Sequence, residues 1–192
     1  MLAILSKLAA ALSDFDFTLG SRSGAGAVTT GVTAAEYGDG VIHQTVLTLS
    51  SVAITMTDAG AAGSHGSKKV YDFPAGLIHI LGATTNLTTL AGSGGIGDTG
   101  ALVGSLGSVA VATDNATLTS TEANVVPSTD GTLVGGAGTL KGKSTADAVL
   151  DGTGTAIDLL LNLAVPDADS SADDTVTVSG TITITWVSHG DN

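Results

Sequence analysis

The segment from Thr175 to Val187 alternates between apolar and hydroxyl-bearing residues, and no other feature of the chain constrains its fold as strongly. The large apolar residues share one parity, interrupted only at Gly180: Val176, Val178, Ile182, Ile184 and Trp186. Successive side chains of a strand point to opposite faces of a sheet. Thirteen residues at about 3.3 Å each span about 43 Å, more than twice the usual strand. We therefore predict a long strand with one buried face.

A second alternating run precedes this strand. Ile157 to Val165 carries apolar residues at every other position, Pro166 ends the run, and the sequence PDADSSADD connects it to Thr175. Two alternating runs joined by an acidic loop predict a long antiparallel β-hairpin. Such a ribbon is typical of a protein that works through shape and contact rather than chemistry.

Further strand patterns run along the chain. From Val41 to Thr57 the buried parity changes at Ser50–Ser51, which predicts a β-bulge. Thr119 and Glu122 have the spacing of a capping box and predict one helical turn. The other predicted strands are 68–73, 77–81, 86–90, 102–112 and 132–141. Together they predict an all-β, single-domain antiparallel β-sandwich, jelly-roll-like, with a short N-terminal arm.

The sequence divides into two parts. Residues 1–40 form an arm followed by a Gly/Ala/Thr-rich segment, and residues 41–192 form the β-sandwich domain. Apolar residues at three- and four-residue steps predict a short amphipathic helix in the arm. Four of them are candidates for a subunit or shell contact: Leu2, Leu5, Leu8 and Leu12. Lys7 lies inside the apolar stretch, which is not typical of a secretory signal, and no run is long enough to span a membrane.

Charge and composition narrow the possible partners. Eighteen acidic residues against six basic ones give a net charge of −12, so we expect no nucleic-acid partner and no membrane surface as partner. The acidity serves solubility or complements a basic partner surface. The absence of cysteine excludes disulfides and thiolate metal sites. Only 3% aromatic residues and 27 glycines predict a modestly stable subunit that gains stability from its neighbours.

Several short motifs formally match chemical sites. Gly92-x-Gly94-x-x-Gly97 has the spacing of a dinucleotide-binding loop, but no βαβ pattern surrounds it. The stretch from Gly94 to Asp98 only nearly matches a calcium-binding nonapeptide. The carboxylates of the acidic loop offer either calcium ligands or a solvated hairpin loop: Asp167, Asp169, Asp173 and Asp174.

The four histidines lie far apart in the sequence and form no metal-binding pair; His65 falls in a predicted turn, and His43 and His79 fall in strands. We expect hydrogen-bonded structural histidines, no catalytic residues, no metal and no cofactor, and therefore no enzyme.

Three stretches carry a resemblance to a known class of proteins: Val52 to Gly76, Ala101 to Thr129, and Asp151 to Asn192, together about half the chain. They resemble small structural proteins encoded beside the head genes of tailed bacteriophages, especially marine ones. The resemblance implies a capsid decoration (cement) protein, a homo-oligomer and often a trimer, that binds the major capsid protein. It also implies assembly in the host bacterial cytoplasm and a place on the capsid surface of the virion.

Two alternatives stay open. One is another virion part, such as a head fibre base or a tail-tube component. The other is a secreted bacterial β-sandwich that binds carbohydrate or mediates adhesion. Carbohydrate sites usually display aromatic platforms, and the chain has only one tryptophan, two tyrosines and three phenylalanines. Trp186 falls on the predicted buried parity.

Overall fold

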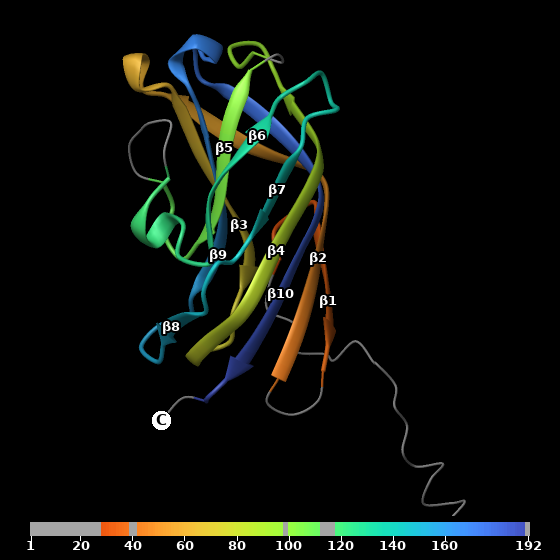
Figure 1. Cartoon of the computed structure of the whole chain (residues 1–192), viewed down its shortest axis with the longest axis vertical. Helices are drawn as coiled ribbons and strands as arrows, with labels where there is room; N and C mark the ends of the chain where they lie inside the picture. Colours follow the sequence, from red (N-terminus) through yellow and green to blue (C-terminus); the bar gives the residue numbers. More distant parts are fainter. Residues whose placement is uncertain (1–27, 39–41, 98–99, 112–117, 191–192) are drawn as a thin grey trace, which may run out of the picture.

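A computed structural model describes residues 28–38, 42–97, 100–111 and 118–190, in which ten strands pair antiparallel in one sheet (Figure 1). The strands are β1 (Val32–Tyr37), β2 (Ile42–Asp58), β3 (Ser64–Asp72), β4 (Gly76–Gly92), β5 (Ala101–Gly107), β6 (Val126–Thr132), β7 (Leu140–Lys143), β8 (Ala148–Gly152), β9 (Asp158–Val165) and β10 (Asp174–Ser188). Three short 3-10 turns accompany them: η1 (Gly60–Ala62), η2 (Ser120–Glu122) and η3 (Asp167–Asp169).

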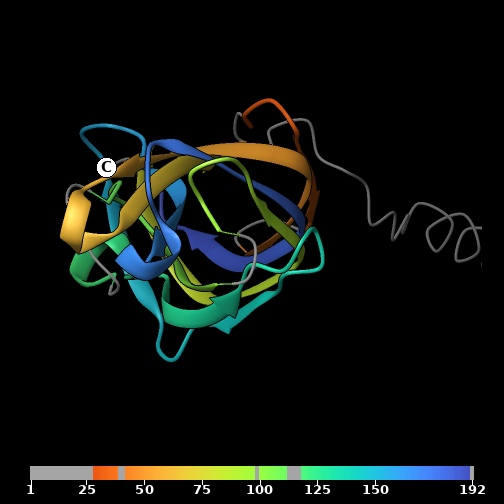
Figure 2. The ribbon, with the colours of Figure 1, turned by 90° about the horizontal axis from the view of Figure 1, so that it is seen from above.

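The sheet closes on itself. Its strand order is β1-β2-β10-β4-β7-β6-β5-β9-β3, and β3 pairs back with the last residues of β2. β1 pairs with the first half of β2, and β8 pairs with the first part of β4. Figure 2, which looks along the long axis, shows the strands curving around one interior. The all-β, antiparallel, single-domain prediction is thus confirmed, in the form of a sandwich whose edges meet to make a barrel.

The alternating apolar residues of β10 point into the interior of the barrel. All five apolar residues predicted to face inward are buried, Trp186 included. Because β10 pairs with β2 on one side and β4 on the other, its apolar face lies at the centre of the longest strands. Phe73 meets Trp186 edge to face, with ring centroids 5.4 Å apart. Burial of each such side chain contributes about 1.5–3 kcal/mol, and β10 shares the core with the buried residues of β2 and β4.

The predicted β-bulge at Ser50–Ser51 is confirmed. Val52 pairs with Val178 and Leu49 pairs with Gly180, so two serines of β2 face Ser179 alone. Ser51 has a φ of 51° and donates its backbone N–H to the Ser179 hydroxyl at 2.9 Å. The extra residue shifts the side-chain parity, which keeps the apolar residues on both sides of the bulge inside.

The predicted hairpin between the two alternating runs is wrong. β9 pairs with β3 and β5, whereas β10 pairs with β2 and β4. The eight-residue connection, 166–173, is longer than hairpin loops of about 2–5 residues, and it carries the chain across one end of the barrel. β9 is also buried at consecutive positions from Leu161 to Val165, unlike the alternating β10. A run covered on both faces fits a strand at a different place in the sheet.

Two other strand predictions need correction. The segments 77–81 and 86–90 belong to one 17-residue strand, β4, which continues through bulges at Leu81 and Thr88. Each bulge shifts the parity, and the threonine-rich sequence between them shows little hydrophobic contrast. The predicted strand 132–141 is a loop flanked by β6 and β7. The capping box is confirmed, since Thr119 and Glu122 make both of its contacts around η2.

The segment 1–40 contributes a strand to the sheet. β1 lies within the part that the sequence analysis assigned to the arm and the Gly/Ala/Thr-rich segment, and it pairs with β2 from Val32↔Leu49 to Tyr37↔Gln44. Leu2, Leu5, Leu8 and Leu12 lie outside the described residues.

Candidate functional site

Three connections meet at the end of the barrel where β10 begins, at the top of Figure 1: the β2–β3 turn, the β4–β5 loop and the β9–β10 loop. Carboxylates gather at two of these connections, the β2–β3 turn and the β9–β10 loop. We call this surface the acidic loop end and define it by Asp58, Asp167, Asp169, Asp173 and Asp174. In the described part of the chain, no lysine is hydrogen-bonded or ion-paired to any of the five.

Asp174 is the best-anchored of these carboxylates. Its Oδ1 accepts the Ser93 hydroxyl at 2.5 Å, and its Oδ2 accepts the Gly95 N–H at 2.7 Å. The Ser93 hydroxyl first, and then the Gly95 N–H, hold the pKa of Asp174 below its usual value of 3.8. Gly94 has a φ of +42°, and a Cβ there would lie 2.0 Å from Oδ2. Only glycine therefore leaves room for the carboxylate.

The glycine-rich loop and the acidic loop lie against each other. Gly97 donates its N–H to the Asp169 carbonyl, and Ser171 donates its N–H to the Gly95 carbonyl, both at 2.8 Å. Ile96 and Ser170 form an isolated β-bridge. Sequence reasoning treated the two loops as separate motifs, because nothing local links residues about eighty positions apart.

The β2–β3 turn joins the same assembly. Asp173 Oδ1 accepts the backbone N–H of Asp58 at 2.6 Å, and the hydroxyls of Ser64 and Ser170 are in contact. The acidic loop end is thus a surface whose loops are fixed to one another by hydrogen bonds. The carboxylates of Asp58, Asp173 and Asp174 accept hydrogen bonds from backbone N–H groups, which hold these three side chains in place before any partner arrives.

The structure shows the surroundings of the dinucleotide-binding and calcium-binding motifs. Gly92 ends β4, and the loop after it leads into strand β5 rather than a helix, so the dinucleotide motif lacks its structural context. Within the described residues, no group of three or more His, Cys, Asp or Glu side chains is arranged to hold a metal ion. The carboxylates of Asp173 and Asp174 accept backbone N–H groups instead. Asp98 lies outside the described residues.

The four histidines do not form one cluster. His79 Nε2 is 2.8 Å from Asp147 Oδ2, and its ring lies 6.2 Å from that of His189. The hydrogen bond from His79 holds the pKa of Asp147 below its usual value. His65 lies near the start of β3, not in a turn as predicted.

His43 belongs to a polar group inside the other end of the barrel. Its Nδ1 is 2.5 Å from Glu36 Oε1, and its ring stacks on Trp186, whose indole N–H donates to the Thr45 hydroxyl at 2.9 Å. Glu36 is only 5% exposed, and its Oε2 has no hydrogen-bond partner among the residues that the structure describes. Sequence reasoning missed this glutamate, although it shares the inward parity of Val32 and Ala34. An inward-pointing charge on an edge strand disfavours pairing with other chains.

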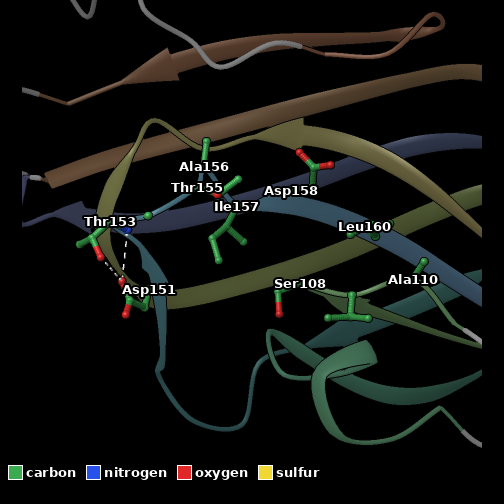
Figure 3. A pocket seen from close by; sticks show the side chains of 11 residues that line it. Ser108, Ala110, Asp151, Thr153, Thr155, Ala156, Ile157, Asp158 and Leu160 are labelled. Carbon is green, nitrogen blue, oxygen red and sulfur yellow. Dashed lines mark hydrogen bonds between the residues drawn. The ribbon is translucent and has the colours of Figure 1, made fainter.

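An open groove of about 830 Å³ runs between the end of β5 and the β8–β9 loop (Figure 3). Both carboxylates that line the groove accept hydrogen bonds from neighbouring side chains. Asp151 accepts the Thr153 hydroxyl at 2.7 Å, which lowers the pKa of Asp151, and Asp158 accepts the Lys69 ammonium group at 2.8 Å. The groove therefore offers mainly apolar walls, from Val109, Ile157 and Leu160.

Comparison with known proteins assigns no family. The chain matches no protein-family model and no curated protein. Among solved structures, it is similar to an arabinose-bound α-L-arabinofuranosidase at 9% identity and a TM-score of 0.30, covering 84% of this chain and 23% of that one. It is also similar to the CBM22-1–GH10 modules of a Clostridium thermocellum xylanase in complex with xylohexaose, at 14% identity and a TM-score of 0.26, covering 85% and 26%.

The chain thus spans about a quarter of the length of each neighbour, and likenesses at these TM-scores carry no weight for fold or function. Within the described ranges, no helix has the length and apolar character needed to cross a membrane.

Proposed function

We propose that this chain is a virion structural protein that decorates the capsid shell, binding the major capsid protein lattice as a trimer. Three stretches covering about half of the sequence support this proposal through their resemblance to head-gene-associated proteins of tailed phages. In the structure, the observation that supports it best is the acidic loop end. There, five carboxylates lie at the β2–β3 and β9–β10 connections, the β4–β5 loop is hydrogen-bonded to the second of these, and none of the five has a lysine partner among the described residues.

A fixed anionic surface suits attachment to a repeating lattice. Complementary charge accelerates encounter and selects the partner, and loops that are already ordered lose little entropy on binding. A trimer presents three such surfaces at once, so modest contacts add up through effective concentration. The same surface would bind less tightly as salt concentration rises, because exposed charges are screened.

A pair of charge-matched variants tests this proposal. Asp167→Asn with Asp173→Asn removes two charges from the acidic loop end, and the new amide in place of the Asp173 carboxylate keeps an oxygen that can accept the Asp58 N–H. Asp147→Asn with Asp151→Asn removes two charges from exposed positions elsewhere. Occupancy of purified particles, measured by gel densitometry, should fall several-fold for the first pair and stay near the parent value for the second. Equal occupancy for both pairs would refute attachment through this surface.

The alternatives make different predictions. A fibre or connector component would be present in about a dozen copies or fewer per particle, and a decoration protein in hundreds. A carbohydrate-binding module would need an exposed aromatic platform. Among the described aromatic residues, Trp186, Tyr71 and Phe73 are buried and Tyr37 is half-buried. Binding to a glycan array at useful affinity would revive that alternative.

A further inference from the structure

Apolar side chains line up on the outside of the barrel, at the end opposite the acidic loop end. The strand register pairs Ile42 with Val187, Val187 with His79, and His79 with Val149, across four neighbouring strands. All four residues have the outward parity of their strands, because the alternate positions are the inward ones. Directly paired side chains in a sheet lie about 5 Å apart, so this row is continuous.

Two leucines of β4 extend the row. Leu77 and Leu81 lie two residues before and after His79, on the same outward face. We call this surface the outer patch and define it by Ile42, Leu77, Leu81, Val149 and Val187, arranged around His79. Ile42 is 54% exposed, Leu81 46% and Val149 63%. A contiguous apolar patch of this kind marks an interaction site, whereas scattered exposed apolar residues need no partner.

We infer that the N-terminal segment 2–12 of the same chain docks on the outer patch. The described chain begins at Val28, and 27 residues precede it. The first twelve carry leucines at three- and four-residue steps, Leu2, Leu5, Leu8 and Leu12, which would place one apolar stripe on a helix. Such a stripe needs an apolar surface to cover it, and the outer patch is a surface of the right chemistry that lacks a cover in the described structure.

The length of chain is sufficient. Gly31 accepts the backbone N–H of Ser50, so the described chain starts beside the middle of β2. From Ser50 to Ile42 the strand covers about 26 Å. Residues 13–27 number fifteen and reach at most about 50 Å when extended. Because the segment and the patch belong to one chain, their effective concentration favours docking within the chain over docking on a second copy at low protein concentration.

Cysteine pairs test the inference directly, because the parent chain has no cysteine. Leu5→Cys and Leu8→Cys are each combined with Val149→Cys in the full-length protein and oxidised in a glutathione disulfide buffer at micromolar concentration. The matched controls combine the same N-terminal cysteines with Val134→Cys. Val134 is 50% exposed and lies in the β6–β7 loop, whose Gly138 accepts the backbone N–H of Leu90 near the far end of β4.

At least one Val149 pair should give an intramolecular disulfide in at least tenfold higher yield than its Val134 control. A disulfide requires Cα atoms within about 7 Å, so only a docked segment favours one position over the other. Equal yields at the two positions would overturn the inference. A disulfide mainly between two chains would overturn docking within one chain.

A dye-binding measurement keeps the inference testable if the cysteine variants fold poorly. Deleting residues 1–12 should increase the fluorescence of a hydrophobic dye severalfold, because the outer patch is uncovered. Adding Ile42→Ser and Val149→Ser to the deletion should return the signal to the parent level. Unchanged fluorescence on deletion would contradict docking. Neither readout involves a capsid, so this inference stands or falls separately from the proposed function.

Discussion

His43 stacks its imidazole ring on the indole of Trp186, with the ring centroids 4.2 Å apart and 12° between the planes. The same imidazole is hydrogen-bonded to Glu36, which is buried on the inner face of β1. One side chain thus joins the edge strand of the sheet to the aromatic end of the core.

Removing His43 alone should destabilise the protein strongly. His43→Leu leaves the Glu36 carboxylate buried without its partner, and we expect the free energy of unfolding to fall by about 3 kcal/mol. The double variant Glu36→Leu with His43→Leu should recover most of that loss, since it leaves no unpaired carboxylate. Urea unfolding of the parent, both single variants and the double variant measures the coupling. Additive losses would show that the pair contributes no interaction of its own.

Two glycines with nearly the same φ allow the cost of a left-handed backbone to be separated from the cost of crowding by an added Cβ. Gly94 has a φ of +42° and faces Asp174, whereas Gly135 has a φ of +43° and would leave an added Cβ with no neighbour within 4 Å. Alanine at either position costs about 1 kcal/mol for the left-handed conformation. Gly94→Ala should cost more than Gly135→Ala, because the added Cβ displaces the hydrogen-bonded carboxylate of Asp174. Thermal unfolding compares the two, and equal losses would contradict the packing of these loops.

Stability at the acidic loop end should depend on pH in a defined direction. Since the folded state lowers the pKa of Asp174 below 3.8, this carboxylate stabilises the fold above that pH and loses its effect as the pH falls through the folded pKa. Ser93→Ala removes the largest cause of the shift. The stability difference between parent and variant should be present at about pH 6 and shrink at about pH 2.5.

Ser171→Ala serves as the control for this pH series. Its hydroxyl donates to the Gly95 carbonyl at 3.2 Å, which is not a titrating group. The loss from Ser171→Ala should therefore be similar at both pH values. Denaturant unfolding at each pH gives both differences, and a pH-independent loss for Ser93→Ala would contradict the role assigned to Asp174.

Deleting Ser51 should disrupt β2 far more than substituting it. The deletion removes the bulge and shifts the register of one half of the strand by one residue. Side chains that faced inward in that half then face solvent. Lost burial of Leu47 and Leu49 alone is worth about 3–6 kcal/mol. Ser51→Gly keeps the residue count at a φ of 51° and should stay within about 1 kcal/mol of the parent. Circular dichroism and urea unfolding distinguish the two, and a stable deletion variant would contradict the bulge.

Features that depend on the local alternation of apolar and polar residues could be predicted from the sequence. The inward face of β10, the strand nature of β2 and the bulge at Ser50–Ser51 all follow from which neighbouring residues are apolar. The pairing of β9 did not follow, because the choice of partner depends on contacts distant in sequence and the connecting loop permits more than one route. β4 was divided because its threonines blur the apolar pattern.

The candidate site was predictable only in part. The acidic loop and the glycine-rich loop were each visible, but their contact joins Ser93 and Asp174, which are 81 positions apart. No single sequence contains a signal for that pairing. Glu36 could have been recognised as a charged residue at an inward-facing position, because it continues the alternating pattern of the apolar residues Val32 and Ala34. It was missed because β1 was grouped with the arm.

A density map of the virion that carries this chain tests the central claim most directly. We expect hundreds of copies on the outer surface of the shell, as trimers, with Asp167, Asp169 and Asp173 facing basic side chains of the major capsid protein. Density for the chain in the tail, or at the shell with the acidic loop end turned toward solvent, would contradict it.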